Sequence, residues 1–330
     1  MHMADALLSP AVGGTMLALS AGVLAGSIRD IRKHFQESRV PLMGVAGAFV
    51  FAAQMVNFAI PGTGSSGHIG GAVLLAALLG PSPAFLVMAG VLLIQALFFA
   101  DGGLLAWGCN LFNLGFFGCF LAYPYIFRPI AGKRMSHPRV FSASIAACLV
   151  SMELGAFAVT LETLLSGVTE LPFGAFVSVM LPIHLAIGLG EGAATGAVLL
   201  FIRDHLPEAD SLRLEEKRCS VTRLSLVLGL TALLIGGGLS LLASGRPDGL
   251  EWSMEQTAGS AELERSGAVH SFFSRLAENL ALLPDYALPG SDTPLGTTVA
   301  GIAGALLCMI LLAAAGCALC RRTTRRRAAK

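Results

Sequence analysis

The stretch PAFLVMAGVLLIQALFFA, residues 83–100, contains 18 residues and no charged side chain. A helical run of this length nearly crosses the hydrocarbon core of a bilayer, because an α-helix rises about 1.5 Å per residue. Eight further apolar runs of comparable character occur along the chain of 330 residues. The sequence therefore predicts an all-α fold, a polytopic transmembrane helical bundle of about nine spans.

The composition of the chain agrees with a membrane protein. Apolar residues make up 55% and charged residues 13%, and the mean hydropathy is +0.73, far from the average of soluble domains. The third predicted span is short, so we expect it to be tilted or partly re-entrant. The nine spans are expected at about residues 11–28, 42–60, 69–80, 83–100, 104–123, 141–165, 173–202, 222–244 and 298–320.

The basic residues that follow the first span set the predicted orientation. Arg29, Arg32 and Lys33 come after the first apolar run and not before it, which places the amino terminus outside by the positive-inside rule. The segment 245–297 holds three arginines and eight acidic residues and is expected to be external. We predict a multi-pass protein of the cell (inner) membrane, whose cytoplasmic segments are 29–41, 124–140, 203–221 and 321–330.

A change in composition near residue 204 divides the chain. Residues 1–203 are predicted to form a seven-span unit, residues 204–221 a cytoplasmic linker, and residues 222–330 a two-span unit with the external loop 245–297. A formal net charge of +1, with no basic face apart from these membrane-flanking segments, argues against a nucleic-acid partner.

The first two residues are a candidate metal chelator. The α-amine of Met1, the backbone nitrogen of His2 and the His2 imidazole can close two fused rings around one cation. His68, in a glycine-rich stretch predicted to lie on the same side of the membrane, can fill the remaining equatorial position. Four nitrogens in a plane suit Ni(II) or Cu(II), and imidazole also suits cobalt. The candidate metal ligands are therefore Met1, His2 and His68.

Several motifs in order resemble one family. MHMADALLSP (residues 1–10) looks like the amino terminus of the substrate-capture components of nickel and cobalt energy-coupling-factor transporters, the CbiM/NikM family. Pro247-Asp248-Gly249-Leu250-Glu251 resembles a motif of the small two-span companion subunit of these systems, so the chain looks like a fusion of the two. The other matching stretches, within a resemblance over about residues 1–203, are Asn57 to Gly71, Gln95 to Gly103 with Asn110 and Asn113, and His184 to Gly192.

The resemblance implies a function and a set of partners. It implies that Met1, His2 and His68 bind the transported ion, Ni(II) or Co(II), and that a transmembrane coupling subunit and cytoplasmic ATPase subunits complete the transporter in the bilayer. The chain has no G-x-x-x-x-G-K-[ST] loop, so it does not hydrolyse ATP itself. We expect a transporter subunit and not an enzyme. Nickel is slightly favoured, and cobalt uptake for cobalamin synthesis by the same mechanism is the alternative.

Polar residues near the predicted outer ends of spans are candidates to support the ligands. A ligand histidine usually donates its other ring N–H to an acceptor. Asp101 can be that acceptor, or it can cap the helix that follows it. The asparagines are expected rather to bond between helices. These candidates are Asp101, Asn57, Asn110 and Asn113.

Two ionisable residues in the seventh span share one helical face. His184 and Glu191 are seven positions apart, and we interpret them as a buried structural or interface pair in preference to a metal relay. Small residues at spacings of four predict close helix contacts. One series is Gly188, Gly192 and Gly196, and a second, suited either to internal packing or to docking the coupling subunit, is Ala18, Gly22 and Gly26.

Two other functions are weaker alternatives. An intramembrane serine protease would use Ser66, in Gly64-Ser65-Ser66-Gly67, with His184 as base, but Ser66 is expected in a loop outside the membrane. A proton- or sodium-coupled metal carrier that works alone would need no ATPase partner.

Overall fold

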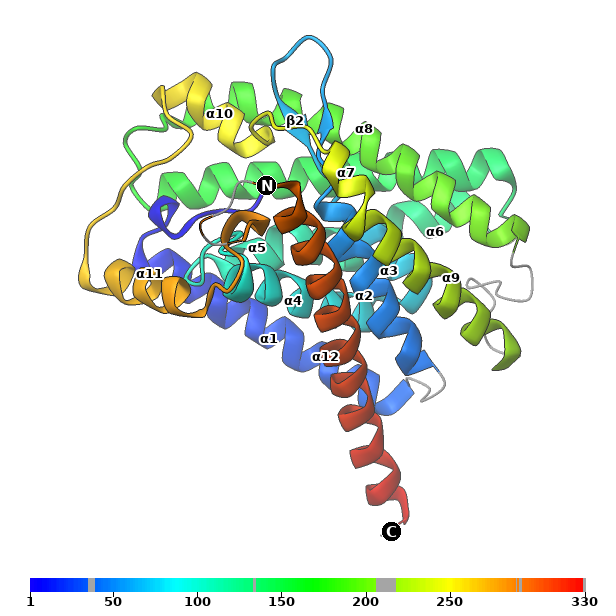
Figure 1. Cartoon of the computed structure of the whole chain (residues 1–330). Helices are drawn as coiled ribbons and strands as arrows, with labels where there is room; N and C mark the ends of the chain where they lie inside the picture. Colours follow the sequence, from blue (N-terminus) through cyan, green and yellow to red (C-terminus); the bar gives the residue numbers. More distant parts are fainter. Residues whose placement is uncertain (35–38, 133–134, 206–217, 289, 291–292, 329–330) are drawn as a thin grey trace.

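Helices make up almost all of the regular structure in the computed structural model, which describes residues 1–34, 39–132, 135–205, 218–288, 290 and 293–328 (Figure 1). The amino-terminal part contains η1 (Asp5–Leu7), α1 (Pro10–His34), α2 (Val40–Gln54), α3 (Ala72–Leu79), α4 (Pro81–Phe98), α5 (Trp107–Leu111), η3 (Phe112–Phe127), α6 (Arg128–Ala131), α7 (His137–Leu165) and α8 (Phe173–His205). The rest contains α9 (Arg218–Gly237), η5 (Leu239–Leu242), α10 (Gly249–Ala258), α11 (Ala268–Leu280), η6 (Pro284–Tyr286) and α12 (Pro294–Ala328).

The lengths of the apolar helices agree with a multi-pass membrane protein. Among the described residues, six helices are long and apolar enough to cross a bilayer, and α2 and part of α9 are shorter apolar helices. Together with α3 they correspond to the nine predicted runs, since α5, η3 and α6 follow one another without a break. The predicted all-α bundle is confirmed. The six long helices are α1, α4, the α5–α6 segment, α7, α8 and α12.

The third predicted span is a helix of only eight residues, α3. Its rise of about 12 Å is less than half of the hydrocarbon core, so it does not cross alone. Glycines with φ of 85° and 87°, Gly71 and Gly80, flank it, and glycine adopts this left-handed region at little cost. Gly71 N–H donates to Glu191 Oε1 of α8 at 2.8 Å. The chain thus enters the bundle in non-helical form before α3 begins.

The predicted end of the second span, residue 60, is wrong by six residues. Helix α2 ends at Gln54, and Phe58–Ala59 (β1) then pairs antiparallel with Ser66–Gly67 (β2). The apolar residues of β1 continue the hydrophobic run beyond the helix, so hydropathy alone does not mark the boundary. The resulting hairpin projects from the bundle at the end where α10 lies (Figure 1).

The two spans of the carboxy-terminal part pack directly against the amino-terminal bundle. Helices α9 and α12 both contact α2, and α12 lies beside α2 in the centre of Figure 1. Glycines permit these close approaches: a Cβ at Gly44 would lie 2.5 Å from the carbonyl oxygen of Met309. The predicted linker lies largely outside the described residues, since 206–217 are not described.

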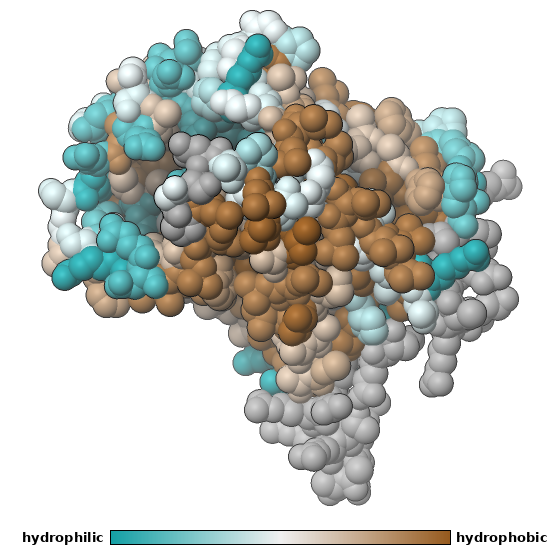
Figure 2. All heavy atoms as spheres, viewed as in Figure 1, coloured by the Kyte–Doolittle hydropathy of each residue, from teal (hydrophilic) through white to brown (hydrophobic). Residues whose placement is uncertain are grey.

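The segment 245–297, expected as a loop, carries helices α10 and α11. Helix α10 packs on α8, and α11 contacts α4 and η1. Hydrophilic side chains gather around α10 and α11, whereas an apolar band covers α12, α2 and α9 (Figure 2). This segment therefore covers one polar end of the bundle.

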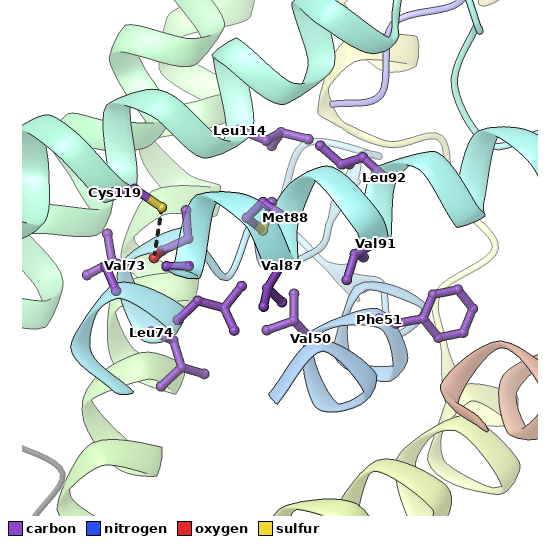
Figure 3. Close-up of a cluster of buried hydrophobic side chains, with 14 of the residues drawn as sticks. Val50, Phe51, Val73, Leu74, Val87, Met88, Val91, Leu92, Leu114 and Cys119 are labelled. Atoms are coloured by element: carbon purple, nitrogen blue, oxygen red, sulfur yellow. Dashed lines mark hydrogen bonds between the residues drawn. The ribbon is translucent and has the colours of Figure 1, made fainter. Parts of the chain in front are cut away.

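The core lies where α2, α3, α4 and η3 meet. Val50, Val73, Val87 and Leu114, one from each of these four elements, are all buried. In Figure 3 Val50 of α2 lies against Val87 of α4, and Leu114 of η3 lies beside Leu92 of α4. The Cys119 thiol lies 3.8 Å from the carbonyl oxygen of Ala72, the first residue of α3, and so links η3 to the half-length helix. Burial of these apolar side chains holds α3 inside the bundle.

At the opposite end, predicted cytoplasmic segments meet one another. His137 Nε2 lies 2.7 Å from Asp204 Oδ2, and Arg203 donates to the carbonyl oxygen of Met135. The segments predicted on the outer side meet around the amino terminus. The predicted cytoplasmic segments and the predicted outer segments thus lie at opposite ends of the bundle, as the charge pattern predicts.

Candidate metal centre

The first residues of the chain form the floor of the candidate site and are held by main-chain bonds. Met3 N–H donates to Asn110 Oδ1 at 2.7 Å, and Asn110 Nδ2 donates back to the carbonyl oxygen of Met3 at 3.1 Å. Gly103 N–H donates to the same carbonyl at 2.9 Å. Met1 is only 4% exposed. The amino terminus is therefore fixed inside the bundle.

The Met1 amine and the His68 imidazole are in direct contact. The Met1 nitrogen lies 3.1 Å from His68 Nε2. His68 Nδ1 lies 3.1 Å from the carbonyl oxygen of Ile69, which accepts only if Nδ1 carries the proton, so the Nε2 lone pair faces the amine. Burial and then the Met1 ammonium lower the pKa of His68 to about 3. The imidazole is therefore neutral, as a metal ligand must be.

A carboxylate from the carboxy-terminal part completes this contact. Asp248 Oδ2 lies 2.5 Å from the Met1 nitrogen and 4.0 Å from His68 Nε2. Burial raises the pKa of Asp248, but the Met1 ammonium and His68 outweigh this effect and hold it well below its usual range. In the sequence Asp248 stands out only as part of the Pro-Asp-Gly-Leu-Glu motif, which gives no reason to place it in the site.

Asp248 is positioned by the start of α10. Its Oδ1 accepts the N–H groups of Leu250 and Glu251, each at 2.8 Å, and Glu251 Oε2 accepts the Asp248 N–H at 3.0 Å. This capping box fixes the carboxylate at the helix amino terminus. The spacing of Asp248 and Glu251 is the signal that could have identified it.

The strand that precedes His68 is bonded to the segment that precedes Asp248. Ser66 N–H donates to the carbonyl oxygen of Pro247 at 2.8 Å, and Ser66 Oγ donates to that of Arg246 at 2.8 Å. Ser66 Oγ serves in this link, and His184 Nε2 has no hydrogen-bond partner in the part of the chain that the structure describes. The two residues therefore do not form the nucleophile–base pair that the serine-protease alternative needs.

His2 stacks on His68 and contacts Asp101. The two rings are parallel to within 7°, with centroids 5.1 Å apart, and His2 Nδ1 lies 3.1 Å from Asp101 Oδ1. Tyr286 O–H donates to Asp101 Oδ2 at 2.6 Å. Burial raises the pKa of Asp101, but His2 and the Tyr286 hydrogen bond outweigh it and lower the pKa below its usual range.

The three predicted ligands therefore come together, but the planar arrangement of four nitrogens is not formed in this structure. Among the described residues, no group of three or more His, Cys, Asp or Glu side chains has the geometry of a metal site. A centre here needs the amino-terminal nitrogen as a donor.

The asparagines have three different positions. Asn110 holds Met3, as described above, and does not join helices. Asn113 donates to Glu162 Oε2 of α7 at 2.8 Å and so bonds between helices, as expected. Asn57 lines the large cavity described below, which also borders His2 and His68, and its carbonyl oxygen accepts the Ser244 N–H at 2.8 Å.

His184 and Glu191 are both buried but do not bond to each other. Glu191 Oε1 accepts the Gly71 N–H and thus fixes the chain just after His68. His184 Nδ1 lies 2.7 Å from the carbonyl oxygen of Met180, and its Nε2 is buried without a partner. His184 lines a small cavity of about 10 Å³ together with Met1, His68 and Asp248. It therefore belongs to the surroundings of the candidate centre.

The two series of small residues have different environments. A Cβ at Gly192 would lie 2.6 Å from Ile145 Cα of α7, and Gly188 and Gly196 also face α7. This face forms the predicted close helix contact. By contrast, Gly22 and Gly26 of α1 have nothing within 4 Å, so that face does not pack inside the described part of the chain.

A large cavity of about 1080 Å³ opens next to the centre. His2 and His68 line it, and no Lys or Arg is among the described residues that do so. Both parts of the chain supply carboxylates to its wall. These are Asp5, Asp101, Asp248, Glu251, Glu262 and Asp285.

Comparison with known families decides the classification. A family model described as the cobalt uptake substrate-specific transmembrane region, CbiM, matches residues 2–209. The chain belongs to the CbiM family. A second model, the PDGLE domain, matches residues 222–321 of this CbiM-family protein, so the fusion expected from the motifs is confirmed. The protein is a multi-pass membrane transport protein and not an enzyme.

Relatives of this CbiM-family protein share the fused arrangement. A putative fused nickel transport protein NikMN of Archaeoglobus fulgidus is 33% identical over 94% of this chain and 96% of its own length. The fused nickel transport protein NikMN of Rhodobacter capsulatus is 31% identical over 93% and 94%. A crystal structure of a transition metal transporter is similar with a TM-score of 0.56 and 30% identity, covering 66% of this chain and all of that one.

Proposed function

We propose that this protein is the metal-binding membrane subunit of an ATP-driven nickel uptake transporter. It captures the ion at the outer face with nitrogens of Met1, His2 and His68. The observation that carries the proposal is the 3.1 Å contact between the Met1 nitrogen and the lone pair of His68 Nε2. Two nitrogen donors at this separation fit adjacent corners of a square around one ion.

His2 supplies the remaining nitrogens of the proposed plane. Its amide nitrogen and Nδ1 can close rings with the Met1 amine, and closing the second ring requires Nδ1 to leave Asp101. The imidazole Nε2–H can then donate to a carboxylate, as ligand histidines usually do. Asp101 is 2.6 Å from the Tyr286 hydroxyl and is available as that acceptor.

Nickel is favoured over cobalt by the named relatives. The fused relatives of Archaeoglobus fulgidus and Rhodobacter capsulatus, matched over 94% and 93% of this chain, are named as nickel transport proteins, whereas the cobalt transport protein CbiM of Geobacter sulfurreducens matches over 72% of it. Planar nitrogen coordination also suits Ni(II). Cobalt uptake for cobalamin synthesis by the same site is the second candidate.

The proposed partners are a transmembrane coupling subunit and cytoplasmic ATPases. The exposed face of Gly14, Ala18, Gly22 and Gly26 on α1 supports this proposal, because small residues let another helix approach closely. A carrier that works alone would instead give full uptake without these subunits.

Nickel titration of the purified full chain tests the proposal. We expect tight binding with the native amino terminus and loss of binding when one residue is added before Met1, because the amine is then displaced from His68. His68→Ala should also abolish binding, and His34→Ala, whose side chain is 73% exposed on α1, should not. Unchanged binding by the extended chain would refute the proposed ligands.

A further inference from the structure

The Met1 nitrogen, His68 Nε2 and Asp248 Oδ2 form a right-angled triangle. The sides that meet at the Met1 nitrogen are 2.5 Å to Asp248 and 3.1 Å to His68, and the third side is 4.0 Å. The Pythagorean relation gives an angle of about 90° at the nitrogen. The midpoint of the 4.0 Å side is therefore about 2.0 Å from all three atoms, a usual distance from a divalent transition metal to nitrogen and oxygen ligands.

A small cavity adjoins this triangle of atoms. Met1, His68 and Asp248 line it, and its volume of about 10 Å³ has room for one water-sized sphere. His184 lines the same cavity, is fully buried, and has no partner for Nε2. Such an atom calls for a water or an ion. The polar atoms that line this cavity are thus suited to bind a water or an ion.

Asp248 Oδ2 would take the corner that the proposed nitrogen plane gives to the His2 amide nitrogen. In that plane the two fused rings put the His2 amide nitrogen between the Met1 amine and the His2 imidazole, so the amide lies opposite His68. With an ion at the midpoint of the 4.0 Å side, Asp248 Oδ2 would occupy the corner opposite His68. A carboxylate can bind the ion there without first removing an amide proton.

We propose that Asp248 is a ligand of the incoming ion. The first complex contains the Met1 amine, His68 Nε2 and Asp248 Oδ2, and the His2 amide nitrogen then replaces the carboxylate as the plane closes. The Met1 ammonium releases one proton to solvent when its lone pair binds the ion. The His2 amide releases a second proton to solvent when its nitrogen binds the ion, and Asp248 leaves the ion as a carboxylate. This inference rests on the proposed function.

The assignment gives the PDGLE domain a direct part in metal capture. Asp248 belongs to that domain, whereas Met1 and His68 belong to the capture unit. Its carboxylate is presented by the α10 capping box and by the hydrogen bonds from Ser66 to Arg246 and Pro247. The ligand set of the first complex is therefore shared between the two fused parts.

Stopped-flow mixing of Ni(II) with the purified full chain, native at its amino terminus, tests the inference. The planar nickel–amide complex is followed by its d–d absorption band in the visible, at protein concentrations high enough to record this weak band. Asp248→Asn and Asp248→Ser should slow its formation at least about 10-fold, because loss of even an indirect partner of a metal ligand costs that much. The final spectrum should be unchanged. Asn and Ser cap helices as well as Asp does, so α10 should keep its start.

Glu251→Gln is the matched control. It removes a carboxylate from the same motif and from the wall of the same cavity, and the glutamine oxygen can still accept the Asp248 N–H in the capping box. We expect it to change the rate by less than about twofold, since its charge alone is screened. A wild-type rate in Asp248→Asn, or an equal slowing in Glu251→Gln, would overturn the inference while leaving the proposed function intact. A planar spectrum retained in His68→Ala would instead overturn the proposed function.

Discussion

The Met1 amine and the Asp248 carboxylate, 247 positions apart, form an ion pair of 2.5 Å inside the protein. This contact joins the start of the capture unit to the start of α10. It holds the amino terminus beside His68. The carboxy-terminal part therefore contributes to the geometry of the candidate centre and does not merely cover it.

The Tyr286 hydroxyl should influence metal affinity through Asp101. Tyr286→Phe removes the 2.6 Å hydrogen bond to Asp101 but keeps the ring stacked on Phe99 at 4.8 Å. Because Asp101 is then less firmly oriented toward His2, we expect the nickel Kd to rise about 10-fold in equilibrium titration. Tyr125→Phe, a 73% exposed position, is the control. An unchanged Kd in Tyr286→Phe would contradict this role for Asp101.

Gly103 should be required for the path of the amino terminus. A Cβ at this position would overlap with the Asp5 carboxylate, and the Gly103 N–H bonds to Met3. Gly103→Ala should displace residues 3–5 and weaken nickel binding at least about 10-fold. Gly174→Ala, with nothing within 4 Å of its Cβ, should bind normally. Normal nickel binding by Gly103→Ala as well would contradict this prediction, because the site would then tolerate a displacement of residues 3–5.

His68 should make the stability of the metal-free protein depend on pH. Its pKa is about 3 in the folded protein against 6.5 for an ordinary histidine, so the unfolded chain binds the proton more tightly. The contribution is complete above pH 6.5 and is lost as the pH falls toward 3. At pH 5 the loss is about 2 kcal/mol.

Thermal unfolding with a chelator at pH 7 and pH 5 measures this effect. The Tm of the wild type should fall further between the two pH values than the Tm of His68→Gln, which has no titrating ring. Equal decreases would mean that His68 is not held neutral by its surroundings.

Close packing of α8 on α7 should depend on Gly192. Its Cβ would lie 2.6 Å from Ile145 Cα, a main-chain atom that cannot rotate away. Gly192→Ala should therefore destabilise the protein by about 1–3 kcal/mol, seen as a lower Tm. Gly22→Ala on the open face of α1 is the matched substitution, and its Tm should not fall because alanine favours helix. A wild-type Tm in Gly192→Ala would argue against tight packing here.

Hydropathy and charge were sufficient to predict the bundle, its spans and the segregation of its loops. They did not locate the end of α2, because Phe58 and Ala59 are apolar whether they lie in a helix or in β1. They also did not reveal helices α10 and α11, which lie in a polar segment between spans. Hydropathy measures transfer from water and not the backbone conformation.

Residue type and position were sufficient to nominate Met1, His2 and His68, because an amine, an amide and an imidazole at the start of a chain already form a chelator. Folding alone decided that Asp248 reaches Met1 and that Tyr286 reaches Asp101. Those pairs are 247 and 185 positions apart, and no local pattern encodes their distance. They are set by how α10 packs on α8 and by the hydrogen bonds of Leu283 and Asp285 to Phe98 and Phe99 at the end of α4.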